Sequence, residues 1–308
     1  MPVVVSTESN ITDDERRHRL YSGEVFCIPP RATAKALADF AFEMIADAFG
    51  SRDPLTAHNE LRVADYIEIL KTLKPGFTHH RRSKELIRDL LIDLGADPTA
   101  TYFDVPKLRV VPPAAYLSAG LSYNYQPHRD TWYSAPQCQN NWWMPVAGNS
   151  AGTGMQFHPD YWQRPAPNTS HDFDAYEWNK TSRRDAATYV KDDPRPHPKL
   201  ADGDSGTALR VVGESGSLLS FSGAQLHSTV PNETSTARLS VDFRSVHLDD
   251  LIARVGPENI DSRCTGTSVR DYIRTDTWES LPEDVVALYD LDGSTDGVLV
   301  FDPAVLTK

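Results

Sequence analysis

The chain has 308 residues, of which 40% are hydrophobic and 24% are charged, as in an ordinary soluble globular protein with a sizeable core. Acidic residues outnumber basic ones by 43 to 31, and the formal net charge of −12 argues against nucleic acid or an anionic membrane surface as a partner. Three scattered cysteines, no apolar stretch long enough to span a bilayer and no signal-peptide pattern predict a cytoplasmic protein.

The first hundred residues favour helices. Apolar residues recur at helical spacing over residues 33–49, and Gly50 is a typical stop signal. Residues 61–73 and 83–94 have the same periodicity, and Gly95 follows the second of them. We therefore expect residues 1–105 to form a helical N-terminal preface.

From about residue 106 the pattern changes to short β-branched or aromatic runs separated by Gly, Pro, Asn and Ser. These runs predict eight strands at residues 107–111, 115–125, 141–146, 155–157, 208–212, 217–221, 226–230 and 237–246. We expect a mostly β protein with flanking helices, built on a double-stranded β-helix, the jelly roll of cupin-like proteins.

Two further segments accompany this predicted core of residues 106–246. Residues 161–206 are too long and too polar for a strand connection, so they form either an active-site lid or a solvated insertion. Residues 247–308 form a C-terminal tail, with a helix at 282–288, that packs on the core. We expect the whole of 1–308 to be one domain, and the sequence does not indicate its oligomeric state.

A metal site is predicted from His128 and Asp130, because residues two apart on a strand point to the same face. A third ligand from elsewhere, His227, would complete two imidazoles and one carboxylate on one face of the ion. That arrangement leaves three open positions and suits Fe(II) and O2 chemistry. His158 and Asp160 have the same spacing, but the intervening Pro159 suits a strand end, so the first pair is preferred.

The second half of the site is predicted from a hairpin. If residues 231–234 form the loop, His227 lies opposite Arg238 on one face of the sheet. Polar and apolar residues alternate along the second strand, so we expect the polar face to line the interior of the barrel. A buried arginine needs an anion, and a dicarboxylic acid bound to the metal would provide one. The structural alternative is an internal salt bridge with Asp242.

The motif His128-Arg129-Asp130, the segment 216–221 leading to His227, and Arg238 eleven residues beyond resemble the Fe(II)/2-oxoglutarate-dependent oxygenases, more narrowly their phytanoyl-CoA-hydroxylase-like branch. The resemblance implies that His128, Asp130 and His227 bind iron. It also implies that Arg238 holds the distal carboxylate of 2-oxoglutarate.

Two more positions follow from the same resemblance. Thr229, two residues after the distal histidine, would help to bind the cosubstrate, and Trp143 would lie beside it. The implied reaction consumes O2 and 2-oxoglutarate, releases succinate and CO2 and oxidises a substrate, with hydroxylation as the default outcome. Asp130 is retained, unlike in the halogenating members, whereas desaturation, ring closure and demethylation stay open.

The expected substrate is a small organic molecule, because aromatic residues crowd the metal-bearing segments. The expected setting is secondary metabolism. Tyr123 and Trp132 are the candidate contacts, although each is also a possible core residue. Two rival classes remain open. One is a cupin-like isomerase or other non-oxygenase enzyme using Mn or Zn, and the other is a non-catalytic barrel that binds a small molecule.

Overall fold

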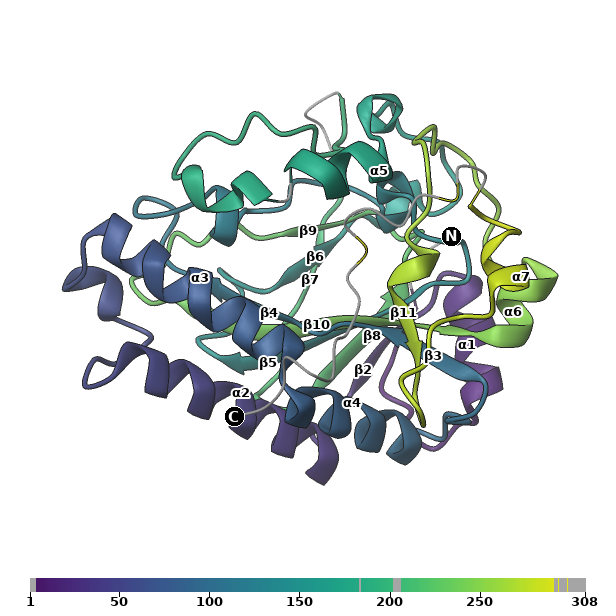
Figure 1. Cartoon of the computed structure of the whole chain (residues 1–308), viewed down its shortest axis with the longest axis horizontal. Coiled ribbons are helices and arrows are strands. Elements are labelled where there is room, and N and C mark those ends of the chain that lie inside the picture. Colours follow the sequence, from purple (N-terminus) through teal and green to yellow (C-terminus); the bar gives the residue numbers. More distant parts are fainter. Residues whose placement is uncertain (1–3, 183, 202–205, 291–292, 294–297, 299–308) are drawn as a thin grey trace.

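Two β-sheets face each other in the structure, and helices cover the outer face of the larger one (Figure 1). The computed structural model describes residues 4–182, 184–201, 206–290, 293 and 298. The larger sheet has eight strands, and apart from the parallel pair of its first two strands its neighbours are antiparallel. The smaller sheet has three antiparallel strands. This pair of facing sheets confirms the predicted jelly-roll core.

The larger sheet has the strand order β1-β2-β8-β5-β10-β3-β11, and β4 also pairs with β10. Its strands are β1 (Val5–Ser6), β2 (Val25–Ile28), β3 (Thr101–Asp104), β4 (Lys107–Val111), β5 (Asn140–Ala147), β8 (Leu218–Ser222), β10 (Arg238–His247) and β11 (Tyr272–Arg274). The smaller sheet has the order β7-β6-β9, with β7 (Leu209–Val211), β6 (Met155–Phe157) and β9 (His227–Thr229).

Strand β10 shows how the larger sheet separates a core from a cavity. Its apolar residues Leu239, Val241 and Phe243 belong to the main hydrophobic core, together with residues of the helices. Its alternate residues include Arg238, Asp242 and Arg244, which line the space between the two sheets. The period-two alternation in the sequence therefore places a hydrophobic face toward the helices and a charged face toward the interior.

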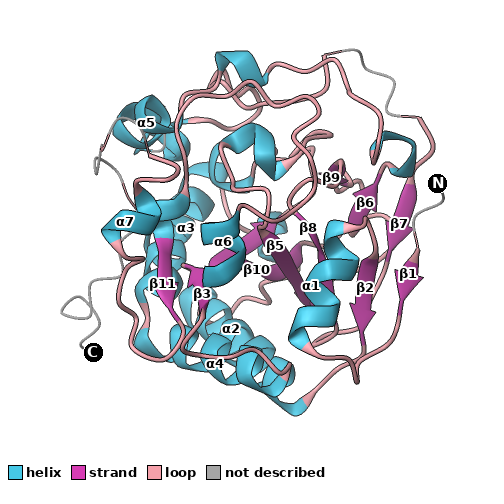
Figure 2. Ribbon diagram, turned by 90° about the vertical axis from the view of Figure 1, so that its right-hand side faces the viewer, coloured by secondary structure: helices cyan, strands magenta, loops and turns pink. Residues whose placement is uncertain are grey.

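Seven α-helices are described: α1 (Asp13–Tyr21), α2 (Ala32–Phe49), α3 (Val63–His79), α4 (Arg81–Asp93), α5 (Ala175–Glu177), α6 (Leu248–Ala253) and α7 (Glu283–Val286). Helix α2 packs against β5 and β10 (Figure 2), and α3 packs against β4 (Figure 1). The three predicted N-terminal helices are confirmed as α2, α3 and α4, and α3 continues past Pro75 to His79. Helix α1 and strands β1 to β3 within the preface were not predicted.

Short helical turns complete the secondary structure. The 3-10 turns are Ala57–Asn59, Gly120–Ser122, Asp130–Tyr133, Pro159–Tyr161, Ser170–Asp172, Arg184–Thr188 and Val269–Asp271, and Trp178–Ser182 is a π-helix. No helix among the described residues is both long and apolar enough to cross a membrane.

The strand predicted over residues 115–125 is wrong. This segment is irregular and contains only the 3-10 turn Gly120–Ser122. Gly120 has a φ of +59° and its backbone lies directly against the carbonyl oxygen of Ala186, so a side chain would not fit there. The chain bends at this glycine to meet the 161–206 excursion, and an extended strand cannot make that bend.

The hairpin predicted across residues 231–234 is also wrong. Strand β9 pairs with β6 in the smaller sheet, whereas β10 pairs with β5, β4 and β3 in the larger one. The intervening residues cross from one sheet to the other, and the Asn232 side chain donates hydrogen bonds to the carbonyls of Val111 and Thr236. His227 and Arg238 therefore approach the interior from opposite sheets. Their pairing across one ladder does not occur.

The two flanking segments reach the interior as well. Phe173, Ala175, Trp178 and Asn179 from the excursion line a cavity that residues of the larger sheet and of the tail also border. In the C-terminal tail, β11 adds an edge strand next to β3, and the predicted helix at 282–288 is observed as the shorter α7. The excursion residues 183 and 202–205, and the tail residues 291–292, 294–297 and 299–308, lie outside the described residues.

Candidate metal centre

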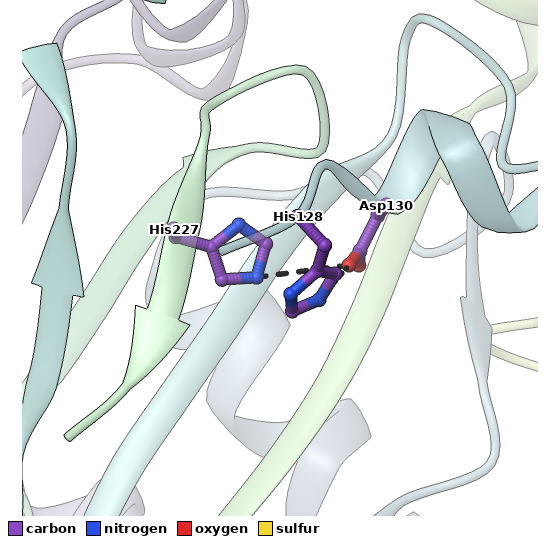
Figure 3. Close-up of side chains that lie close together, drawn as sticks. All are labelled: His128, Asp130 and His227. Atoms are coloured by element: carbon purple, nitrogen blue, oxygen red, sulfur yellow. Dashed lines mark ion pairs between the residues drawn. The ribbon is translucent and has the colours of Figure 1, made fainter. Parts of the chain in front are cut away.

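Three predicted ligands converge at one point between the sheets (Figure 3). One ligand atom from each of His128, Asp130 and His227 lies within 4.8 Å of the other two. The Oδ1 atom of Asp130 is 3.4 Å from Nε2 of His128 and 3.7 Å from Nε2 of His227. All three residues are buried, each only 5% exposed. A carboxylate and two imidazoles at these distances form a donor set that fits a divalent transition metal.

The backbone fixes the two histidines relative to each other. His128 and His227 form an isolated antiparallel bridge, in which each amide donates to the other's carbonyl oxygen at 2.9 Å. Asp130 begins the 3-10 turn Asp130–Tyr133, and its amide donates to the carbonyl of Gly223 at 2.8 Å. His128 is thus held by a single bridge, and Asp130 by a tight turn. The strand on which the prediction of this pair relied is absent.

Hydrogen bonds also set the tautomer of each imidazole. Nδ1 of His128 lies 2.7 Å from the carbonyl oxygen of Gln126, and Nδ1 of His227 lies 2.9 Å from that of Gln225. A carbonyl can only accept, so Nδ1 donates its proton and Nε2 keeps a free lone pair directed at the centre. Burial, reinforced by His128, lowers the pKa of His227 to about 3. The ring is therefore a neutral ligand at physiological pH.

The carboxylate of Asp130 is held by its second oxygen. Nε2 of Gln139 donates to Oδ2 at 2.8 Å, and Nε of Arg244 lies 3.4 Å from the same oxygen. Gln139 is held in turn by the hydroxyl of Tyr272, which donates to its Oε1 at 2.7 Å. These contacts leave Oδ1 to face the histidines. Burial alone would raise the pKa of Asp130, but Arg244 and the imidazoles outweigh it and keep that pKa well below its usual range.

A cavity opens from the triad toward Arg238. It is lined by the three ligands and by the predicted cosubstrate residues Arg238, Thr229 and Trp143, and Tyr123 also contributes to its wall. The guanidinium of Arg238 lies over the ring of Trp143, 5.7 Å from the ring centroid. The structure thus brings together all of the predicted site residues except one.

Arg238 has no acidic partner among the described residues. Its Nε and Nη1 atoms are buried and make no hydrogen bond to any described residue. Asp242, the predicted alternative partner, pairs instead with Arg109 at 2.6 Å and with Arg244 at 3.5 Å. Burial and the nearby Arg109 lower the pKa of Arg238 to about 10, so the group stays cationic. A buried cation without a partner requires an anionic ligand.

A second cation faces the same cavity. Lys74 of helix α3 lines the wall, and its amino group donates only to the carbonyl oxygen of Leu121 among the described residues. Burial, together with Arg109, lowers the pKa of Lys74 to about 7. An incoming carboxylate would favour the protonated form, because an opposite charge stabilises the ammonium.

A second cavity lies on another side of the same triad. Its lining shares Tyr125, His128, Asp130 and Arg244 with the first cavity, and then extends to Tyr133, Phe173 and Trp178. The candidate metal therefore borders two spaces with different walls.

The prediction that Trp132 contacts a substrate is wrong. Its side chain is fully buried, packs with Tyr161 and Leu226 and donates from Nε1 to Oδ1 of Asp261 at 2.7 Å. It lines neither of the two cavities at the triad. An indole whose only polar atom already has a buried partner serves the core rather than a ligand.

The competing histidines lie outside the triad, as predicted. Nε2 of His158 lies 3.1 Å from the hydroxyl of Ser228, and the buried ring takes no part in the triad. His171 is largely exposed, with 60% of its side chain accessible, beside Asp172. Neither offers a buried set of three donors among the described residues.

Several residues of the site were not predicted: Lys74, Arg109, Gln139 and Tyr272. Lys74 lies in an amphipathic helix, where its sequence context matches that of a solvated lysine. Tyr272 lies in the tail, more than a hundred residues beyond Asp130. Arg244 was not predicted either, although it had a sequence signal, because it continues the alternating polar face of β10.

No protein-family model matches the chain, and no curated protein matches it. One similar solved structure is EvdO2 from Micromonospora carbonacea var. aurantiaca complexed with 2-oxoglutarate, with 13% identity over 80% of this chain and 94% of that chain and a TM-score of 0.46. Another is the non-heme α-ketoglutarate-dependent carbocyclase SnoK from nogalamycin biosynthesis, with 14% identity, coverage of 82% and 94%, and a TM-score of 0.42. These values are too low to assign an activity to this chain.

Proposed function

We propose that the chain is an Fe(II)/2-oxoglutarate-dependent dioxygenase. The observation that carries the proposal is the convergence of His128, Asp130 and His227 in a cavity whose far wall presents the unpartnered guanidinium of Arg238. Two neutral imidazoles and one carboxylate are the donor set that non-heme Fe(II) oxygenases use. A keto-diacid that chelates the metal at one end would satisfy the buried arginine at the other.

Each residue then has a defined task. The two imidazoles and Oδ1 of Asp130 would hold Fe(II), and Gln139 and Arg244 would orient the carboxylate through its second oxygen. Arg238 would bind the distal carboxylate of 2-oxoglutarate, with Thr229 and Trp143 beside it. Iron in this site would activate O2 at the expense of 2-oxoglutarate, with release of succinate and CO2.

The proposal extends to the substrate and the setting. We propose a small organic molecule as substrate, hydroxylation as the outcome, and a role in secondary metabolism, with the whole chain acting as one oxygenase domain. The three cysteines form no disulfide, which suits a reducing cytoplasm.

The test is an anaerobic titration of the purified protein with Fe(II) and then 2-oxoglutarate. We expect a visible metal-to-ligand charge-transfer band when the keto-acid chelates the iron, and its loss in His227→Ala. His171→Ala is the matched control, because His171 also stands next to an aspartate but is exposed and outside the triad. That variant should keep the band.

The rival classes predict different results. An isomerase that uses Mn or Zn, or a barrel that only binds a ligand, would give no such band and no consumption of 2-oxoglutarate in air. The isomerase would have no need of Arg238 in this place. Absence of both signals in the wild-type protein would refute the oxygenase.

A further inference from the structure

The second cavity at the triad differs from the first in its charges. Its charged lining residues are Asp104, Lys107, Asp130, Arg244 and Asp271. Lys107 pairs with Asp104, and Arg244 lies within 3.4 Å of both Asp104 and Asp130. Asp271 also has an interaction partner. Both cations of this wall are therefore already paired with carboxylates.

An aromatic wall runs along the other side of this cavity. It starts beside the candidate ligand His128, whose ring centroid is 5.3 Å from those of both Tyr125 and Tyr133. Phe173 follows at 5.1 Å from Tyr133, and Trp178 at 5.6 Å from Phe173. Such a row of ring faces and edges suits the flat faces of a ring compound.

Hydrogen-bonding groups lie in the same wall. The side chains of Asn179 and Ser268 line the cavity and make no hydrogen bond to other described residues. They come from different segments, the π-helix of the excursion and the tail. An amide and a hydroxyl at this place can bind hydroxyl or carbonyl groups without demanding a charge.

We propose that this cavity is the substrate site and that it takes an uncharged ring compound carrying hydroxyl or carbonyl groups. The inference rests on the proposed function, since it requires a metal at His128, Asp130 and His227 to act on the molecule. Part of the excursion, from Phe173 to Asn179, is then a wall of the substrate site.

Charge discrimination in this cavity follows from desolvation. A charged group entering it would lose water without gaining an opposite charge, because each ionic group of the wall is already engaged. An uncharged hydroxyl would exchange water for Asn179 or Ser268 at little cost. The site therefore selects against charge as well as for ring shape.

The probe for the test is arbutin, the uncharged glucoside of hydroquinone, compared with two matched charged compounds. The first is the corresponding glucuronide, which carries a carboxylate, and the second is an aminomethylphenyl glucoside, which carries an ammonium. Each is added to the anaerobic protein loaded with Fe(II) and 2-oxoglutarate, and paramagnetic broadening of its proton resonances is recorded by NMR. This broadening reports proximity to the metal and does not depend on turnover.

We expect arbutin to be broadened with an affinity at least about tenfold above that of either charged counterpart. Hydroquinone and methyl β-glucoside, tested separately, show which ring is recognised, and binding of either supports the proposal. Equal or tighter binding of a charged counterpart would overturn it. Failure of all the uncharged probes to broaden would also overturn it.

Variants locate the binding. Trp178→Ala should weaken arbutin about fivefold through the loss of an aromatic contact. Asn179→Leu, which preserves size, should weaken it by a similar factor. Lys180→Ala is the control, because Lys180 lies in the same π-helix but does not line the cavity, and it should bind arbutin as the wild type does. Equal affinity in all three variants would contradict the assignment.

The outcome is separable from that of the oxygenase test. If the charge-transfer band forms but no uncharged probe is broadened, the substrate assignment fails and the proposed function stands. If no band forms, the proposed function itself fails.

Discussion

The two cavities at the triad share the candidate ligands His128 and Asp130, but they differ in whether their cationic side chains are paired with carboxylates. In the first, no described acidic residue pairs with the buried Arg238, and the one described partner of the Lys74 amino group is a carbonyl oxygen. In the second, Lys107 and Arg244 are already paired with carboxylates. Unsatisfied charge indicates where an ion must bind, and satisfied charge indicates where it must not. On the proposed function, the first cavity would bind the anionic cosubstrate and the second the uncharged substrate, on two sides of the same triad.

The largest expected effect concerns Arg238. We expect Arg238→Ala to raise the dissociation constant for 2-oxoglutarate about 100-fold, because a buried charge-assisted pair is lost. Fe(II) affinity without 2-oxoglutarate should stay nearly unchanged. The two constants are measured by anaerobic titration.

A measurement of stability adds to this test of Arg238 in the first cavity. An unpaired buried cation destabilises the free protein, so Arg238→Ala should leave the unfolding temperature unchanged or raise it. An unchanged requirement for 2-oxoglutarate together with a lowered unfolding temperature would return Arg238 to a structural role.

The second prediction concerns the support of Asp130, which lines both cavities. Gln139→Ala should weaken Fe(II) binding about 10- to 30-fold, because the second oxygen of Asp130 loses its closest donor. Tyr272→Phe removes only the bond to Gln139, so its effect should be smaller and in the same direction. Metal affinity is measured by competition with a chelator. An unchanged affinity in Gln139→Ala would show that the carboxylate does not need this support.

The third prediction tests whether Trp132 serves the core and not the aromatic wall of the second cavity. Trp132→Phe should lower the free energy of unfolding by about 1–2 kcal/mol, because Asp261 loses a buried donor. Binding of arbutin to the loaded protein should not change. Denaturant unfolding and the NMR titration check the two halves, and weaker arbutin binding with unchanged stability would restore Trp132 as a substrate contact.

The smallest expected effect is a dependence of 2-oxoglutarate affinity on pH, through Lys74 in the first cavity. A lysine whose pKa is lowered to about 7 is protonated below that pH and loses its charge as the pH rises. We therefore expect the affinity for 2-oxoglutarate to fall about fivefold between about pH 6 and 8. The charged groups that face Lys74 are Arg109, Arg238 and Asp242, and the pKa shifts of all three leave their charges fixed over this range.

Lys74→Met is the control for the pH effect. It should bind 2-oxoglutarate more weakly at low pH than the wild type does, and its affinity should be nearly independent of pH. A wild-type affinity that is flat across the range would contradict a proton-linked role for Lys74.

The sequence was enough to propose the three candidate ligands, which the structure brings together. His128 and Asp130 are two residues apart, and no slip in strand register separates them by much. The predicted backbone conformation was nevertheless wrong. His128 lies in an isolated bridge and Asp130 in a 3-10 turn, whereas a strand was expected. Arg238 stays a predicted cosubstrate contact, and the structure buries it in the wall of the first cavity. A buried arginine demands an anion whichever strand pairs with its own.

The long-range geometry could not be predicted from the same pattern. Alternation along a strand fixes which face a residue occupies, but not which sheet the strand joins. Residues 231–234 were therefore predicted as a hairpin loop, although the chain crosses between the sheets there. Trp132 shows the same limit, since an aromatic residue next to a ligand has equal access to core and cavity until the packing is known.

Tyr272 has a consequence for how the protein is made. The hydroxyl that steadies Gln139, and through it Asp130, sits on an edge strand synthesised long after the ligands themselves. A nascent chain that stops before β11 already carries all three metal donors, yet lacks the last support for its carboxylate. Iron offered during translation would thus meet a looser site than iron offered to the finished protein.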